Sequence, residues 1–316
     1  MSTTLNSGID PASFSAVTGP AQDLFRYVNG PWIDMYRLPD DRSRYGSFDK
    51  LAEDAENQIR EILEDDDCPA EKSHALYASF LDVDAINASG LAAIEDQLKA
   101  IDVAADKAEL TRSLGAMNPA GGPDLIGIAV YGDPGAPETN IIHVEQAGLG
   151  LPDEAYYRED HYAPIREAYV DMVAKQLKNA KLAADSEQAE ADAKRFLDVE
   201  TRIAANHWDN VATRDSVKTY NPTDYAELSA MLADYDLDTW IESWQSAYDQ
   251  TSAAQVQPLD FRGIFNHVVV HEPSFLTGLN AFWKAADLDD LKLWARVHVI
   301  IGSTLELPHE FDETNL

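Results

Sequence analysis

Residues Ser47–Glu64 read SFDKLAEDAENQIREILE, and their periodicity decides the fold class. Apolar side chains recur at i, i+4, i+8, i+11 and i+12 along this stretch: Leu51, Ala55, Ile59, Ile62 and Leu63. Charged and amide side chains fill the opposite face, as in an amphipathic helix. We therefore predict a helix that Ser47 caps and that stops at the acidic run Asp65–Asp67 before Pro69.

The same helical period extends over most of the chain. It predicts further helices at Ser73–Leu81, Leu91–Ile101, Ile165–Leu177, Ala189–Ala205, Tyr225–Leu232, Leu237–Trp244, Ser274–Ala285 and Leu291–Ile301. The exceptions are the β-rich runs Leu125–Tyr131 and Asn140–Glu145, which predict a β-hairpin with a long Gly/Pro connection, and the short strand His267–Val270. The expected fold is mainly α, a multi-helix domain with one small β-hairpin.

Composition narrows the possible partners. The 316 residues include 24 Lys+Arg and 56 Asp+Glu, a net charge of −32, which opposes binding to duplex nucleic acid or an anionic membrane. Apolar runs such as Val297–Ile301 are too short to cross a bilayer, and residues 1–20 show no targeting signal, so we expect a cytoplasmic protein. The single cysteine, Cys68, allows no intrachain disulfide, and its acidic surroundings oppose a reactive thiolate.

Motifs that carry catalysis are missing from the sequence. No H-E-x-x-H zinc motif occurs, and His271-Glu272 and His309-Glu310 fail at its fifth position. His267 and His271 have the right spacing for a helical metal pair, but they lie in strand-like sequence. There is also no nucleophile elbow, P-loop or dinucleotide fingerprint. We predict no catalytic and no metal-binding residue in this chain, and we expect its histidines to be ordinary packed or surface residues.

Three other motifs occur in a fixed order. The first is DLFRYVNGPW at residues 23–32, which continues through Leu38-Pro39 to SRYGSF at 43–48. The second is GLGLPD at 148–153, followed by Tyr156-Tyr157, and the third is Arg214-Asp215 with KTYNP at 218–222. Together they resemble the neprilysin family of zinc endopeptidases, whose bacterial members include endopeptidase O. The resemblance extends from Asp23 to Leu316.

The resemblance implies a domain organisation. Residues 1–22 would be a flexible N-terminal extension, and residues 23–316 would be the helical, non-catalytic half of a neprilysin-like peptidase. The H-E-x-x-H helix of such enzymes comes later in their chains, and Glu310–Leu316 resembles a segment that normally continues. We therefore expect a truncated part of a zinc metalloendopeptidase. Zinc would belong to the full-length parent, and this chain alone would neither bind it nor cleave peptides.

The resemblance also assigns roles to residues. The helical half would act as a lid that restricts a peptide-cleaving cavity to short substrates, and Arg44 would pair with the C-terminal carboxylate of the peptide. A guanidinium suits that task because it stays charged and grips a carboxylate bidentately. The alternative for Arg44 is a structural salt bridge at the start of a helix. The remaining motif residues are interpreted as structural: core aromatics at Tyr27, Trp32, Tyr45 and Phe48, a turn at Asn29–Pro31, and cap or turn groups at Asp215 and Asn221.

A different class of protein remains open, a stand-alone helical module that binds a peptide or protein without catalysis. The two hypotheses differ in the surface they predict. A severed half of an enzyme exposes a contiguous apolar seam where its partner would pack, and this seam favours self-association. In the enzyme hypothesis, the peptide substrate is reached only through the missing catalytic half.

Overall fold

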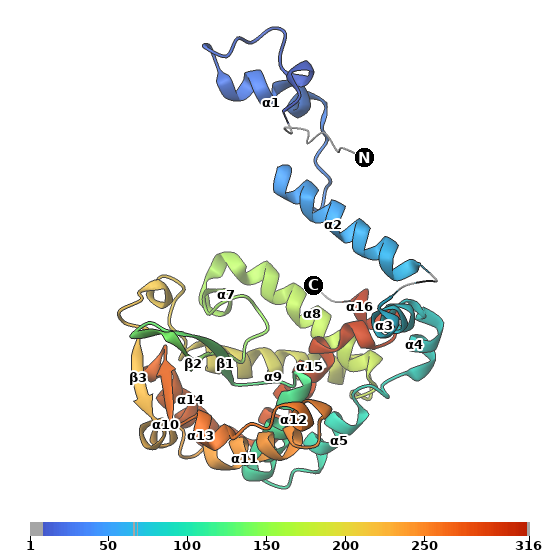
Figure 1. The fold of residues 1–316 in the computed structure, drawn as a ribbon. Coiled ribbons are helices and arrows are strands. Elements are labelled where there is room, and N and C mark those ends of the chain that lie inside the picture. Colours follow the sequence, from blue (N-terminus) through green and yellow to red (C-terminus); the bar gives the residue numbers. More distant parts are fainter. Residues whose placement is uncertain (1–8, 66, 68, 315–316) are drawn as a thin grey trace. The chain divides into compact units, whose positions relative to one another are not determined.

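The computed structural model describes residues 9–65, 67 and 69–314, which divide into two units, residues 1–79 and 80–316 (Figure 1). Several sequence predictions fall outside the described residues: positions 1–8 of the expected extension, Asp66 in the helix stop signal, Cys68, and the last two residues of the segment Glu310–Leu316. The expected boundary at residue 22 stays a prediction. Each unit is described by itself.

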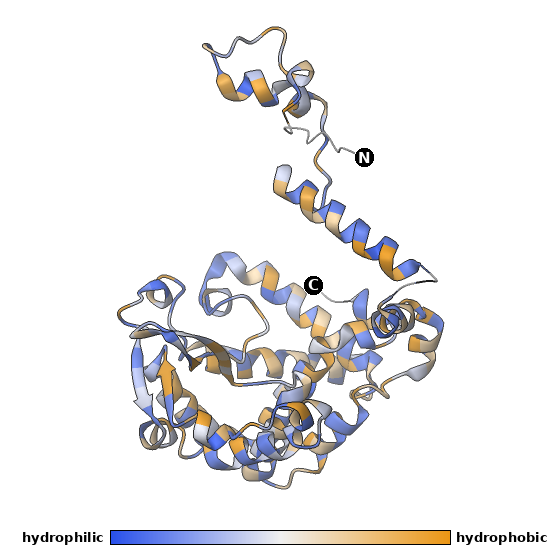
Figure 2. Ribbon diagram, in the orientation of Figure 1, coloured by the Kyte–Doolittle hydropathy of each residue, from blue (hydrophilic) through white to orange (hydrophobic). Residues whose placement is uncertain are grey.

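The first unit contains a short 3-10 turn, Pro11–Ser13, and the helices α1 (Leu24–Met35), α2 (Ser47–Glu64) and α3 (Glu71–Leu81), the last of which runs on into the second unit. The predicted bounds of α2 are confirmed. Its predicted cap is wrong, because Gly46 occupies the cap position and no side chain caps the helix. Apolar and polar residues alternate along α2 with the expected period (Figure 2).

Helix α1 corrects a second sequence prediction. The expected turn at Asn29–Pro31 lies inside this helix, which begins where the Asp23 carboxylate accepts a hydrogen bond of 2.9 Å from the backbone N–H of Arg26. Pro31 has no N–H to donate to the carbonyl of Tyr27 four residues earlier. The backbone N–H of Ser15 donates to the carbonyl of Tyr27 instead, at 2.7 Å. This carbonyl is therefore paired, and the helix continues through the proline.

The second unit contains a four-stranded sheet with the strand order β1-β2-β4-β3 (Figure 1). Strands β1 (Ile126–Asp133) and β2 (Ala136–Gln146) form the predicted hairpin, but they continue to a tight turn in place of the long connection. β4 (His267–Val270) is the predicted short strand; it pairs parallel with β2 and antiparallel with β3 (Asn221–Asp224). The hairpin is therefore half of a small mixed sheet.

Helices make up most of the rest of the described chain. Those predicted from the period are present as α3, α5 (Glu95–Val103), α8 (Ala163–Asn179), α9 (Ser186–Ala204), α10 (Tyr225–Met231), α11 (Leu237–Tyr248), α14 (Pro273–Ala285) and α15 (Leu288–Gly302). The structure adds α4 (Val83–Ser89), α6 (Lys107–Met117), α7 (Ala155–Arg158), α12 (Ser252–Val256), α13 (Phe261–Ile264) and α16 (His309–Asp312). The prediction of a mainly α fold is confirmed.

A continuous apolar core fills the second unit. Its largest fully buried side chains include Trp240, Trp283 and Trp294, carried by α11, α14 and α15. At one point two helices meet backbone to backbone: a Cβ added to Gly115 on α6 would lie 2.3 Å from the carbonyl oxygen of Trp240 on α11. Glycine is required there because any side chain would force the helices apart.

Some of the acidic residues cap helices. Aspartate caps many of the helices by accepting a hydrogen bond from a backbone N–H of the first turn: Asp10, Asp23, Asp82, Asp106, Asp185, Asp224, Asp236 and Asp260. A negative charge is also favourable at the positive end of the helix dipole. Among the described residues, no helix is both long and apolar enough to span a membrane.

Candidate substrate-binding loop

The first sequence motif spans α1, the loop of residues 36–46 that follows it, and the first turn of α2. An aromatic stack holds the loop against α1: the ring of Tyr36 lies 4.7 Å from that of Trp32 and 4.6 Å from that of Tyr45, with interplanar angles of 21° and 24°. Offset stacking of this kind adds to the area that the rings bury. The prediction of core aromatics at Tyr27, Trp32, Tyr45 and Phe48 is wrong. Trp32 and Phe48 are exposed, with Phe48 keeping 87% of its surface, and Tyr27 and Tyr45 are only half-buried.

A carboxylate on α2 holds the other side of the loop. Glu53 accepts a hydrogen bond of 2.7 Å from the hydroxyl of Tyr45 and forms an ion pair with Arg42 at 3.2 Å. The neighbouring carboxylate raises the pKa of Tyr45 to about 12, so this hydroxyl remains a donor at physiological pH. Glu53 was not singled out from the sequence, because one carboxylate among 56 acidic residues carries no signal.

Arg44 lies between these two anchor points. It is exposed, and its guanidinium forms no hydrogen bond or ion pair with any residue that the structure describes. The structural salt bridge considered for Arg44 is instead made by Arg42. Arg44 is thus available to an external anion.

A groove of ≈ 330 Å³ lies beside Tyr45, the residue that follows Arg44. It is lined by Phe25, Asn29, Trp32, Ile33, Tyr45, Gly46, Ser47 and Lys50. These residues combine an apolar wall from α1 with the first turn of α2, whose backbone N–H groups no side chain caps. Backbone N–H groups without a side-chain cap suit a polar group, and the aromatic wall suits an apolar side chain. The Lys50 ammonium is already paired with the Asp54 carboxylate at 2.9 Å.

The second motif is structural. Gly148 has φ +93°, a conformation that favours glycine, and its carbonyl accepts a hydrogen bond of 3.0 Å from the Trp294 indole. The fully buried Glu200 on α9 accepts from the backbone N–H of Gly150 at 2.8 Å and from the hydroxyl of Tyr157 at 2.9 Å, and it pairs with His298 at 2.8 Å. Glu200 therefore fixes the chain where it leaves the sheet.

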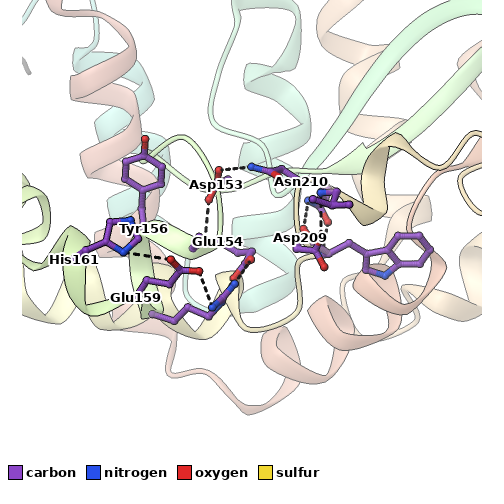
Figure 3. Close-up of polar contacts among 12 residues, drawn as sticks. Asp153, Glu154, Tyr156, Glu159, His161, Asp209 and Asn210 are labelled. Atoms are coloured by element: carbon purple, nitrogen blue, oxygen red, sulfur yellow. Dashed lines mark hydrogen bonds and ion pairs between the residues drawn. The ribbon is translucent and has the colours of Figure 1, made fainter.

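The end of this motif joins the loop that follows α9 (Figure 3). Asp153 accepts hydrogen bonds from the backbone N–H of Ala155 at 2.9 Å and from the side chain of Asn210 at 3.1 Å. Asp209 accepts from two backbone N–H groups of its own turn, which lowers its pKa. Both aspartates are thus occupied by local hydrogen bonds, and the contact between Asp153 and Asn210 connects the two segments.

The third motif is also structural, as the sequence indicated. Asp215 accepts backbone hydrogen bonds from Val217 and Lys218, an Asx turn, and the side chain of Asn221 donates to the carbonyl of Val270 at 2.9 Å. The hydroxyl of Tyr220 donates to Asp133 at 2.9 Å and so joins this loop to the hairpin.

Two histidines that lie far apart in the sequence are in contact in the structure. Nδ1 of His143 on β2 is 2.8 Å from Nε2 of His271, the residue that follows β4. The carboxylate of Glu145 lies 3.7 Å from Nε2 of His271. Burial lowers the pKa of His271. Within residues 9–65, 67 and 69–314, no group of three or more His, Cys, Asp or Glu side chains has a geometry that would hold a metal ion.

Comparison with known proteins identifies the family. A family profile described as peptidase family M13 matches residues 20–316, most of the chain. The chain belongs to peptidase family M13. It corresponds to the N-terminal region of the neprilysin-type zinc metallopeptidases of this family, so the resemblance found in the sequence motifs is confirmed.

Relatives of the M13 chain are longer than it is. Human neprilysin is 25% identical over 321 residues, which cover 92% of this chain and 42% of neprilysin. Endothelin-converting enzyme 1 of Cavia porcellus is 23% identical over 297 residues, covering 89% of this chain and 38% of that enzyme. The chain thus spans less than half the length of these relatives.

Solved structures agree with the fold. The zinc metalloprotease 1 of Mycobacterium tuberculosis, in complex with an inhibitor, is 30% identical with a TM-score of 0.83, and the match covers 98% of this chain and 46% of that one. PepO of Lactobacillus rhamnosis is 19% identical with a TM-score of 0.70, covering 94% and 46%, which shows the shared fold alone.

Proposed function

We propose that this M13 chain is the substrate-restricting N-terminal region of a zinc metalloendopeptidase that hydrolyses short peptides. The family match and the length of its relatives support this proposal. The described residues do not fit a zinc site, because they offer no suitable group of three ligands. The zinc and the groups that act on the scissile bond then belong to another part of the full-length protein, and no catalytic step is assigned to residues of this chain.

The observation that carries the proposal is the free guanidinium of Arg44. An arginine that is exposed, unpaired and placed between two anchored neighbours is ready to bind a carboxylate without first breaking an internal ion pair. The C-terminal carboxylate of a peptide is a planar acceptor that a guanidinium can grip with two hydrogen bonds. The adjoining groove offers an apolar wall for the side chain of the terminal residue.

The lid role has a physical rationale and support from a relative. A region that covers a cavity excludes large substrates and water from the reacting groups. Zinc metalloprotease 1 of Mycobacterium tuberculosis has structures in an open and a partially open state, with TM-scores to this chain of 0.75 and 0.68. We infer that the region represented by this chain takes part in a comparable opening.

The test uses the full-length protein and two peptides that differ only in a terminal carboxylate or carboxamide. We expect Arg44→Ala to raise KM for the carboxylate peptide about 10- to 100-fold, because a charge-assisted hydrogen bond contributes about 1.5–3 kcal/mol. The carboxamide peptide should be unaffected. Arg37→Ala is the matched control, since Arg37 is another exposed arginine of the same loop. Equal effects on both peptides would contradict the assignment.

A second assay tests the absence of activity in this chain by itself. The purified chain of residues 1–316, supplied with zinc, should give no peptide cleavage that a chelator abolishes. Chelator-sensitive turnover by this polypeptide would overturn the division of labour proposed above. Cleavage that persists in the chelator would point to a contaminating peptidase of another class.

A further inference from the structure

Arg44 belongs to a loop that is held at two points by one side chain, Glu53. Arg42, two residues before it, and Tyr45, the residue after it, both bind this carboxylate, at 3.2 Å and 2.7 Å. The segment that carries Arg44 is therefore short, and the residues at both of its ends bind Glu53. Glu53 itself sits on α2, an 18-residue helix, which provides a rigid support.

The aromatic stack limits the loop from its other side. Tyr45 is in contact with Tyr36, and Tyr36 with Trp32, so the loop is held between the helices α1 and α2. The Arg42 guanidinium also lies over the Tyr45 ring, 5.9 Å from its centroid. Arg42 and Tyr45 thus each have a fixed partner, while Arg44 has none among the described residues.

We propose that Glu53 is a positioning residue for Arg44: by binding Arg42 and Tyr45 together, it presents the Arg44 guanidinium to the carboxylate of the peptide in a preformed geometry. This inference rests on the proposed function of Arg44. Its physical basis is preorganisation, because a loop ordered before binding loses less conformational entropy when the ligand arrives.

Electrostatics alone predicts the opposite result. Removing a negative charge near Arg44 makes its surroundings more positive and frees Arg42, and both changes favour binding of an anion. Loss of positioning weakens the same binding. The direction of the change in KM for a carboxylate peptide therefore separates a positioning role from a purely electrostatic one.

The test compares Glu53→Ala with Arg44→Ala in the full-length protein, using the carboxylate and carboxamide peptides. We expect Glu53→Ala to raise KM for the carboxylate peptide about 5-fold, the equivalent of one hydrogen bond, while kcat and the carboxamide peptide stay unchanged. Glu53→Gln keeps an acceptor for Tyr45 and should give a smaller rise. Glu56→Ala, an exposed acid of the same helix, is the control.

The outcomes are distinguishable. If Arg44→Ala removes the preference for a carboxylate but Glu53→Ala leaves it intact or increases it, this inference is overturned and the proposed function stands. If Arg44→Ala itself has no effect, the proposed function fails. Should Glu53→Ala not fold, Tyr45→Phe removes one of the two anchors and keeps the aromatic ring; an unchanged KM ratio in Tyr45→Phe and Glu53→Gln also overturns the inference.

Discussion

The two units of the chain differ in how their helices are stabilised. In the second unit, most apolar side chains of α9, α11, α14 and α15 are buried in one core. Among the described residues of the first unit, only Gly30 is buried, and the apolar stripe of α2 is open: Leu51, Ile59 and Ile62 keep 62%, 56% and 53% of their surface. Periodicity thus specifies a helix locally, whereas its burial requires a partner.

The largest expected effect concerns the fully buried carboxylate of the second unit. Glu200→Ala removes a buried acceptor shared by the Gly150 N–H, the Tyr157 hydroxyl and the His298 ring. We expect the free energy of unfolding of the second unit to fall by about 3–5 kcal/mol. Urea titration followed by tryptophan fluorescence measures it, since the three buried tryptophans lie in this unit.

The control for this prediction is Asp198→Ala on the same helix. The side chain of Asp198 is 70% exposed, and its contact with Arg202 is a long one of 4.0 Å. Its removal should change the unfolding free energy by less than about 0.5 kcal/mol. Similar losses in Asp198→Ala and Glu200→Ala would show that burial of the carboxylate is not the cause.

A second prediction concerns the backbone contact between α6 and α11. Gly115→Ala places a methyl group 2.3 Å from a main-chain oxygen, so one helix has to move. We expect a loss of about 2–3 kcal/mol in the second unit, measured by thermal or urea unfolding. Gly302→Ala, in α15 with open space around it, should be neutral or stabilising by up to about 1 kcal/mol. A neutral Gly115→Ala would mean that the core is more compliant than that of a close-packed domain.

A third prediction uses pH to test how strongly the second unit excludes charge. Burial raises the pKa of Glu272 from 4.5 to about 7, against the backbone N–H of Gln146 that favours its ionised form. The native state then binds this proton more tightly than the unfolded state, so the stabilisation is complete below pH 4.5 and is lost as the pH rises through 7. Glu272→Gln cannot ionise and should abolish this decline.

The measurement is the unfolding free energy at pH 5 and pH 8. We expect the advantage of Glu272→Gln over the original protein to be about 1–2 kcal/mol larger at pH 8 than at pH 5. A difference measurement is needed because His207, whose pKa burial lowers to about 4, has the opposite pH dependence. The exposed Glu306→Gln provides the matched control. An identical pH profile for Glu272→Gln and the original protein would show that Glu272 is hydrated.

The sequence predicted helices and strands better than it predicted contacts between residues that are distant in the chain. Long amphipathic helices and the hairpin follow from periodicity, whereas the edge strand Asn221–Asp224 contains a proline and has no β pattern, so only its pairing with β4 reveals it. The interior Pro31 likewise suggested a turn, because the bond from Ser15 to Tyr27 is not visible in sequence. Arg44 was found through its motif, but Glu53 required the fold, since nothing in the sequence distinguishes it from the other acids.

The smallest expected effect on stability is in the first unit. Leu51→Gln combined with Ile59→Gln removes apolar groups that are already more than half exposed. Little surface is lost from the native state, so the free energy of unfolding should change by less than about 0.5 kcal/mol. The predicted effect is on association: we propose that the open face of α2 promotes contact between copies of this chain, and the double variant should sediment with a smaller weight-average mass.

Glu56→Gln with Glu61→Gln, on the polar face of α2, is the control, and it should leave the association unchanged or increase it by lowering the negative charge. Concentration series in the analytical ultracentrifuge separate the two faces. If Leu51→Gln with Ile59→Gln instead lowers the unfolding midpoint by several degrees, the apolar stripe is buried within a single copy, and the contrast between the two units would have to be abandoned.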